Sequence, residues 1–238
     1  MTVEPNGFFE YLQLLDGEPE LVTKSELIAR VRGAGYPITD RQLTFYVTEG
    51  LMPRSVRVGS RAGAYPTVVV ELLTWIRRAR DVGVSIEALK ELLPVWKFLI
   101  RARSSGELIL GELEYVARQH VTSVEGSLGV VRVVADVMGH RCPRCQKDMV
   151  IVTKDGERRP MNSPETTVGF AIARSFEDED GASTPDWFAA TRVSLAFTDS
   201  HSSDPTTVIL GVKPNEALPP DPDADRSRDC ELEEAATT

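Results

Sequence analysis

The sequence predicts an α+β fold: a mainly α N-terminal half ending in a long coiled-coil helix, then a small β-rich C-terminal domain and an acidic tail. Two capping boxes predict a pair of short helices near the N-terminus. Apolar residues recur at heptad spacing from Glu107 to Met138, and alternate with polar residues after His140. The expected segments are an N-terminal extension (1–20), a helix-rich domain (21–103), a long helix (104–139), a β-rich domain (140–213) and a disordered tail (214–238).

Two short helices are expected between residues 23 and 50. In TKSE (23–26) and TDRQ (39–42), a threonine side chain can accept a hydrogen bond from the amide three residues later, and the acidic or amide side chain there can reach back. Glycines and a proline at 33–37 stop the first helix, and Gly50 stops the second. Two short helices joined by a tight turn form a helix-turn-helix.

A two-stranded ribbon is expected next, between Leu51 and Tyr65. The sequence SVRV alternates in polarity and GSRAG supplies turn glycines, so the ribbon would form a wing directly after the second helix. Helical spacing then resumes over 67–82, and Ser85 can cap a further helix. Pro94 removes one amide from that helix and is expected to kink or split it.

A continuous helix is expected from Glu107 to Met138, with a seam that suits a helical partner. Gly126 and Gly129 oppose it, because each costs about 1 kcal/mol relative to Ala in a helix. A break near Gly126 is therefore one alternative, and cover of the apolar stripe by the β-rich domain of the same chain is another. The apolar positions expected in a dimer interface are Leu110, Leu113, Ala117, Val124 and Val131.

The C-terminal part is expected to be built from strands. MVIVTKDGERRP predicts a strand, an Asp-Gly turn and a second strand, and TVGFAIAR, TRVSLAF and TTVILGV predict three more. The tail from 214 to 238 has 2 Lys/Arg against 8 Asp/Glu, a net of −6, and many prolines, which is typical of disorder.

Charge is distributed unevenly along the chain, whose net charge is −9. Leu21 to Arg103 contains 14 Lys/Arg against 7 Asp/Glu, a net of +7. A basic folded segment with an acidic tail is typical of a nucleic-acid binder, although a simply solvated surface is the alternative. No run of 18 apolar residues and no signal-peptide pattern occur, so we expect a cytoplasmic protein without a membrane partner.

The order of helix, helix, wing, two helices and heptad helix resembles the MerR family of bacterial transcription regulators. The resemblance rests on Arg41, Leu43, Phe45–Tyr46, Gly50–Leu51–Met52–Pro53, a wing arginine, Tyr65 and the segment GVSIEALKELL at 83–93, and it covers about residues 21–138. Two positions depart from the family pattern. Thr44 stands where an arginine usually precedes the aromatic pair, and AGAYP replaces the usual wing end Gly-Tyr-Arg-x-Tyr.

The resemblance implies that the second helix enters the major groove of double-stranded DNA, where Arg41 can pair with guanine and Gln42 with adenine. Tyr46 would either reach a phosphate or pack in the core. Wing arginines suit phosphates or the minor groove, with solvated turn charge as the alternative. The expected DNA-binding residues are Thr39, Arg41, Gln42, Thr44, Phe45, Tyr46, Arg54, Arg57, Arg61 and Tyr65.

The resemblance also implies a homodimer, joined through antiparallel long helices, that binds a palindromic promoter site and, as an activator, engages RNA polymerase. Such a dimer distorts its promoter, which costs several kcal/mol. The sequence leaves activator and repressor equally open. An interaction or adaptor protein, with the winged helix as a platform and the β-rich domain binding a protein partner, is the alternative function. No catalytic triad, P-loop or paired carboxylates occur, so no enzyme is expected.

A candidate metal site lies just after the heptad segment. His140, Cys142 and Cys145 fall within six residues, and a C-x-x-C is half of a tetrahedral zinc site. The remaining ligands are missing from the pattern, although a partner chain could supply them. Some members of the family that the sequence resembles sense metals with cysteines at this place, so zinc is the one candidate cofactor. Two free thiols at a helix end are the alternative.

Overall fold

The computed structural model describes residues 6–15, 20–59, 61–138, 149–160, 166–174, 191–199 and 206–211. In the N-terminal half the elements are α1 (Phe8–Leu12), β1 (Leu21–Thr23), α2 (Lys24–Gly33), α3 (Asp40–Thr48), β2 (Val56–Val58), β3 (Arg61–Pro66), α4 (Val68–Asp81) and α5 (Ile86–Ser105). In the C-terminal half they are β4 (Glu107–Ile109), α6 (Leu110–His120), α7 (Val124–Val137), β5 (Val150–Val152), β6 (Arg158–Pro160), β7 (Thr166–Arg174), β8 (Thr191–Asp199) and β9 (Thr206–Gly211). The predicted α+β class is confirmed.

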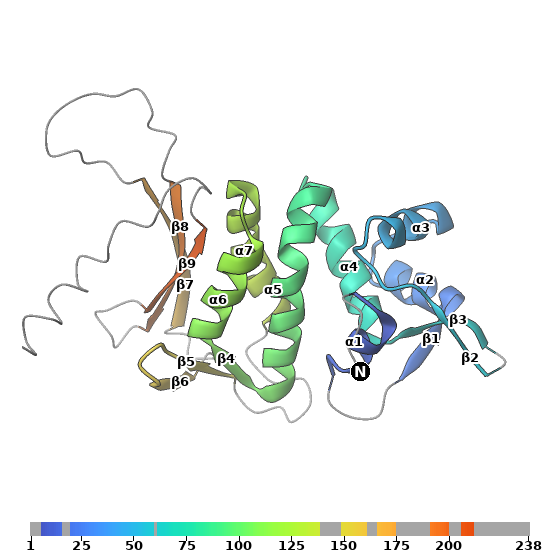
Figure 1. Cartoon of the computed structure of the whole chain (residues 1–238), viewed down its shortest axis with the longest axis horizontal. Helices are drawn as coiled ribbons and strands as arrows, with labels where there is room; N and C mark the ends of the chain where they lie inside the picture. The colour runs from blue at the N-terminus through green and yellow to red at the C-terminus, as the bar shows by residue number, and fades with distance from the viewer. Residues whose placement is uncertain are drawn as a thin grey trace, which may run out of the picture.

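The elements are stacked along the long axis of the molecule (Figure 1). The sheet β7–β8–β9 lies at one end, with α6 and α7 on its inner face, and α5 follows. Beyond α5 lie α4 and then α2, α3 and the ribbon β2–β3 at the other end. One hydrophobic core runs through these layers from Leu27 on α2 to Leu195 on β8. No helix in the described ranges is both long and apolar enough to cross a membrane.

Both predicted capping boxes are present. Thr23 accepts from the amide of Glu26, and Thr39 accepts from the amide of Gln42, and both reciprocal bonds form. Each box satisfies two donors that the first helical turn leaves unpaired. Gly50, with φ of 74°, ends the second helix in a left-handed conformation that suits glycine.

The ribbon has one more strand than the sequence indicates. β2 and β3 pair antiparallel as predicted, and β1, directly before α2, pairs with the other edge of β3. The resulting order is β1-β3-β2, so the chain entering α2 and the ribbon leaving α3 are fixed to each other. The short strand LVT at β1 contains too few residues for alternation to be visible in the sequence.

α5 is one helix of 20 residues with Pro94 inside it, so of the two predicted outcomes, a kink or a split, the split does not occur. The proline still removes one backbone donor. Its neighbours Leu93, Val95 and Trp96 are almost fully buried, and this packing stabilises the helix on both sides of the missing bond.

The prediction of one continuous helix from Glu107 to Met138 is wrong. The segment forms β4, α6 and α7, with the chain extended between the two helices at 121–123. The break has a partner on α5: the carboxylate of Glu91 accepts hydrogen bonds from the amides and hydroxyls of Thr122 and Ser123. Ser123 in turn caps α7 through the amide of Gly126. These bonds replace the intrahelical bonds that a continuous helix would make.

The glycines that weaken a helix here permit close packing instead. A Cβ at Gly129 would lie 2.5 Å from Leu92 Cδ1, and a Cβ at Gly126 would lie 2.3 Å from the Glu91 carboxylate. α7 therefore approaches α5 more closely than residues with side chains at these positions would allow.

The apolar stripe of the heptad segment is covered within the chain. Leu110, Leu113 and Ala117 are fully buried, because α6 packs between α5 and β9. Val131 is partly buried against the same core, and the side chain of Val124 lies outside the described part. At Leu110, Leu113 and Ala117 the predicted seam is thus not exposed, and the structure shows the alternative for them, cover by the same chain.

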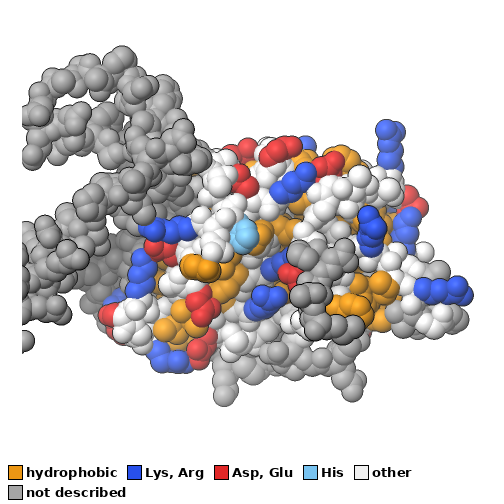
Figure 2. Space-filling model, viewed as in Figure 1, with side chains coloured by type: hydrophobic (Ala, Val, Ile, Leu, Met, Phe, Trp, Pro, Cys, Tyr) orange, Lys and Arg blue, Asp and Glu red, His pale blue; other side chains and the backbone are white. Residues whose placement is uncertain are grey.

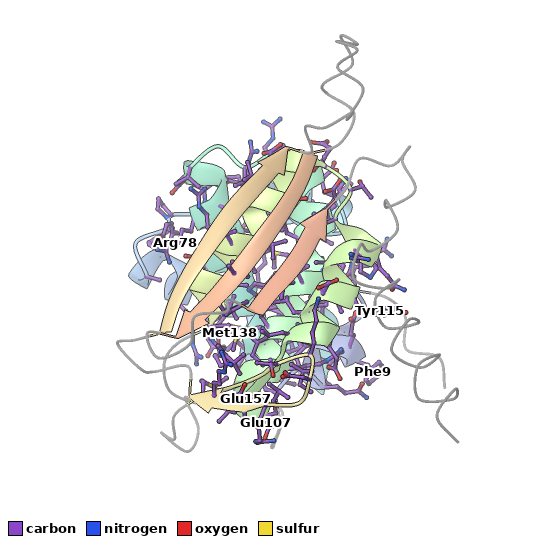
Figure 3. The ribbon with its side chains drawn as sticks, turned by 90° about the vertical axis from the view of Figure 1, so that its left-hand side faces the viewer. Phe9, Arg78, Glu107, Tyr115, Met138 and Glu157 are labelled. Atoms are coloured by element: carbon purple, nitrogen blue, oxygen red, sulfur yellow. The ribbon has the colours of Figure 1, made fainter. Side chains whose placement is uncertain are left out.

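The C-terminal strands follow the predicted order. β5 and β6 pair antiparallel around a turn at Gly156, and β7, β8 and β9 form an antiparallel sheet. Figure 3 shows this sheet lying across α6 and α7. β4 pairs in parallel with β5, so part of the segment 104–139 belongs to the same sheet as residues after 149.

Candidate nucleic-acid interface

The outer face of α3 presents polar and aromatic side chains to solvent. Thr39, Arg41 and Thr44 are exposed, and Phe45 is 44% exposed. The buried face of the same helix contains Leu43 and Tyr46. The two faces follow from helical periodicity, so α3 is fixed on the core with Arg41, Thr44 and Phe45 facing solvent.

Gln42 is occupied by its own helix. Its Oε1 accepts from the backbone amide of Thr39 at 3.0 Å and from the hydroxyl of Thr39 at 3.2 Å. A bidentate contact with adenine uses both the oxygen and the nitrogen of the amide. Such a contact would break the capping box, at a cost of about 1 kcal/mol. The predicted role of Gln42 in base reading therefore competes with its role as a cap.

Two aromatic residues expected at the interface lie in the core. Tyr46 is 4% exposed and belongs to the same buried cluster as Leu27. Tyr65 is 5% exposed and pairs in β-register with Val22. For Tyr46 the structure selects packing between the two interpretations, and Tyr65 likewise holds the ribbon against the helices.

The ribbon presents arginines at the same end of the molecule as α3 (Figure 1). Arg54 precedes β2 and Arg57 lies within it, and both are exposed. Arg61 begins β3, in register with Val58, and its side chain is not among those described. The turn between the strands includes Gly59 at φ of 59°, a conformation that glycine adopts without strain.

The acids around α3 are paired with lysines, whereas the arginines are not paired with acids. Lys24 Nζ lies 2.8 Å from the Asp40 carboxylate, and Lys90 Nζ lies 2.7 Å from that of Glu49. In the described part of the chain, no ion pair involves Arg41, Arg54 or Arg57. Figure 2 shows Lys and Arg side chains projecting at the end of the molecule that carries α3 and the ribbon. The arrangement leaves arginine charge available to phosphates.

The three arginines of α4 have internal partners. Arg77 pairs with Asp81 at 3.3 Å, and Arg80 donates to the carbonyl of Val84 at 2.5 Å. Arg78 pairs with Asp136 of α7 at 3.1 Å. Arg77 and Arg80 thus have partners within α4 or in the turn that follows it, and Arg78 links α4 to α7.

The N-terminal extension contacts the chain just after the C-terminal end of α3. The sequence alone does not predict this contact. Asn6 Nδ2 donates to the carbonyl of Gly50 at 2.9 Å. Glu10 pairs with the buried Lys97 of α5 at 2.7 Å, and the Lys97 ammonium lies 4.9 Å from the ring centre of Tyr11. Tyr11 and Leu14 are almost fully buried. The apolar spacing of three residues in the extension was the available signal for this packing.

Residues 36–95 match the family described as MerR HTH family regulatory protein. The HTH-type transcriptional regulator HmrR of Sinorhizobium medicae (strain WSM419) is 30% identical over 111 residues, which are 47% of this chain and 71% of that protein. The chain belongs to the MerR family. The predicted resemblance is confirmed. The family is described as one of regulatory proteins, which agrees with the expectation that the chain is not an enzyme.

Two further MerR-type relatives come from Rhizobium meliloti (strain 1021). Heavy metal-dependent transcription regulator 2 is 28% identical and heavy metal-dependent transcription regulator 1 is 26% identical, each over 111 residues, or 47% of this chain and 71% of the relative. No solved structure matches the chain.

The candidate metal ligands His140, Cys142 and Cys145 lie outside the described residues. Within the described ranges, no group of three or more His, Cys, Asp or Glu is placed to hold a metal ion.

Proposed function

We propose that this MerR-family protein is a transcription regulator that binds double-stranded DNA, with α3 in the major groove and the ribbon β2–β3 as a wing on the adjacent backbone. The observation that supports it most is the set of exposed arginines without acid partners, beside acids that lysines neutralise. Arg41 is assigned to a base edge, and Arg54, Arg57 and Arg61 to phosphates or the minor groove. Thr39 caps α3, and Thr44 and Phe45 are exposed on it.

The DNA contacts of one module span only a few base pairs, so a homodimer on a palindromic site is part of the proposal. Leu110, Leu113 and Ala117 could form its interface only if α6 separated from α5 and β9, because the same residues are buried there. The proposal therefore places the contact between two copies on other residues. It also includes RNA polymerase as the partner of an activating form.

Footprinting on the region upstream of the protein's own gene tests the function. A protected, roughly palindromic site is expected, and Arg41→Ala should weaken protection and relax base preference, by roughly 1–3 kcal/mol at one position. Arg118→Ala is the matched control, since Arg118 lies on α6 and pairs with Glu114. Unchanged protection by Arg41→Ala would favour the adaptor alternative, in which the module binds a protein.

Metal response is a second candidate function, because two relatives are named heavy metal-dependent regulators. We assign it to Cys142 and Cys145 with His140, since thiolates and imidazole suit zinc and a C-x-x-C supplies two of four ligands. The remaining ligands would come from a second copy of the chain or from solvent.

A further inference from the structure

A cavity of about 220 Å³ lies where α4, α5 and α7 meet. Two tryptophans form its apolar wall: Trp75 of α4 and Trp96 of α5 are stacked, with ring centres 6.1 Å apart and planes 23° apart. Ile100 and Val137 extend that wall. The volume is below the roughly 300–1,000 Å³ of drug-sized sites, so it suits a molecule with a single ring.

The polar lining contains two ion pairs of different exposure. Arg103 pairs with Glu71 and also donates to the carbonyl of Val137 at 3.5 Å. Arg78, labelled in Figure 3, pairs with Asp136 Oδ1 at 3.1 Å. The Arg78 side chain is 55% exposed, whereas that of Asp136 is 11% exposed. The carboxylate is thus held in place, while its partner is at the solvent-facing rim.

One carboxylate oxygen of Asp136 could accept a hydrogen bond from a cationic ligand. Its Oδ2 is buried and accepts no hydrogen bond within the described part of the chain. Burial raises the pKa of Asp136, although Arg78 and then Arg132 oppose the shift. A buried carboxylate oxygen without a donor is costly, and a ligand that supplies two N–H donors would satisfy both oxygens.

We propose that this cavity binds a small planar aromatic cation, whose ring lies against Trp75 and Trp96 and whose amidinium or ammonium group replaces Arg78 at Asp136. The aromatic wall provides stacking and cation–π attraction, and the carboxylate provides a charged hydrogen bond. Arg78 can leave because its side chain is 55% exposed and its charge stays hydrated, while the incoming cation takes its place at the less exposed carboxylate.

Such exchange has a structural consequence. The Arg78–Asp136 pair joins α4, which packs against α2 of the DNA-binding module, to α7 of the C-terminal half. A bound cation would remove that link. An effect on DNA binding rests on the proposed function, whereas occupation of the cavity does not.

Calorimetry on the full chain with benzamidine, benzamide and benzoate tests the proposal. The three probes share a shape and differ in charge. Benzamidine is expected to bind with a Kd of about 1 mM or below, and the neutral and anionic probes at least about tenfold more weakly. Equal binding of benzoate, or no binding of benzamidine, would overturn the proposal, whatever the protein does with DNA.

Two variants separate the proposed exchange from general damage. Asp136→Asn should weaken benzamidine about tenfold or more, while Asp81→Asn, in an exposed pair elsewhere on α4, should leave it unchanged. Arg78→Ala should tighten benzamidine by roughly two- to fivefold, because it removes the competing cation. Since Arg78 is exposed, this variant keeps the test available even if Asp136→Asn fails to fold, and weaker binding to Arg78→Ala would contradict the exchange.

Discussion

Glu91 on α5 and Ser123 at the start of α7 are joined by two hydrogen bonds to one carboxylate oxygen, 3.1 Å from the Ser123 amide and 2.8 Å from its hydroxyl. The relationship is reciprocal, because Glu125 of α7 accepts from the amide and hydroxyl of Ser85, the cap of α5. Donors at the N-terminus of α7 are thus satisfied by Glu91 of α5, and those at the N-terminus of α5 by Glu125 of α7. The helix dipoles also favour negative charge at these ends.

Glu91→Ala should lower the free energy of unfolding by about 1–3 kcal/mol, because amides and hydroxyls of Thr122 and Ser123 lose their acceptor. Glu87→Ala is the control, since Glu87 is an exposed acid in the first turn of the same helix. Urea unfolding followed by circular dichroism measures both. Equal losses in the two variants would mean that the charge near the helix start, and not these bonds, is what matters.

The stability that Glu91 provides should depend on pH. Burial alone would raise the pKa of Glu91, but hydrogen bonds from Ser123 and Thr122 outweigh it and lower the pKa below the ordinary value. A lowered folded-state pKa gives stability that is present above the unfolded pKa, near 4.3, and is lost as pH falls through the folded pKa. The stability gap between wild type and Glu91→Gln should therefore close in acid and be constant from about pH 6 to 8. A gap that widens in acid would contradict this assignment.

Gly129→Ala should destabilise the protein by roughly 1–3 kcal/mol, although Ala favours a helix over Gly by about 1 kcal/mol. The new Cβ would meet Leu92, which is 1% exposed and cannot move away easily. Gly111→Ala is the matched control: it is also helical, and nothing lies within 4 Å of its Cβ position. Thermal melts should show opposite signs for the two variants, and a stabilised Gly129→Ala would refute close packing of α7 on α5.

Zinc binding should require the cysteine pair. Wild type is expected to bind one zinc ion per chain, or one per dimer if a second copy supplies ligands, and Cys142→Ser with Cys145→Ser should abolish it. Cys230→Ser is the control. Competition with a colorimetric chelator measures the zinc affinity. If the double variant retained as much zinc as wild type, Cys142 and Cys145 would be ordinary thiols and not zinc ligands.

The sequence predicted the helix-turn-helix and the ribbon because their signals are local. The capping boxes at Thr23 and Thr39, the stop at Gly50 and the alternation around Arg57 each act within a few residues, and each element is present. The sequence does not fix the place of Tyr46, since helical spacing does not distinguish a core position from the edge of an interface.

The prediction for the heptad segment is wrong because spacing specifies a buried stripe and not the element that buries it. Leu110 and Leu113 satisfy a coiled coil and also the packing of α6 on α5 and β9. The partner of the break at Ser123, Glu91, lies 32 residues away, beyond the range of any local pattern. Ser123 followed by Gly126 was the one local sign of a new helix start.

In the proposed complex, arginines of the ribbon neutralise DNA phosphates. Affinity for the footprinted site should be measured against salt concentration for wild type, Arg57→Ala and the control Arg118→Ala. We expect a linear fall of log K with log salt for wild type, and a slope smaller by about 1 for Arg57→Ala only. An affinity indifferent to salt, or an unchanged slope for Arg57→Ala, would contradict it.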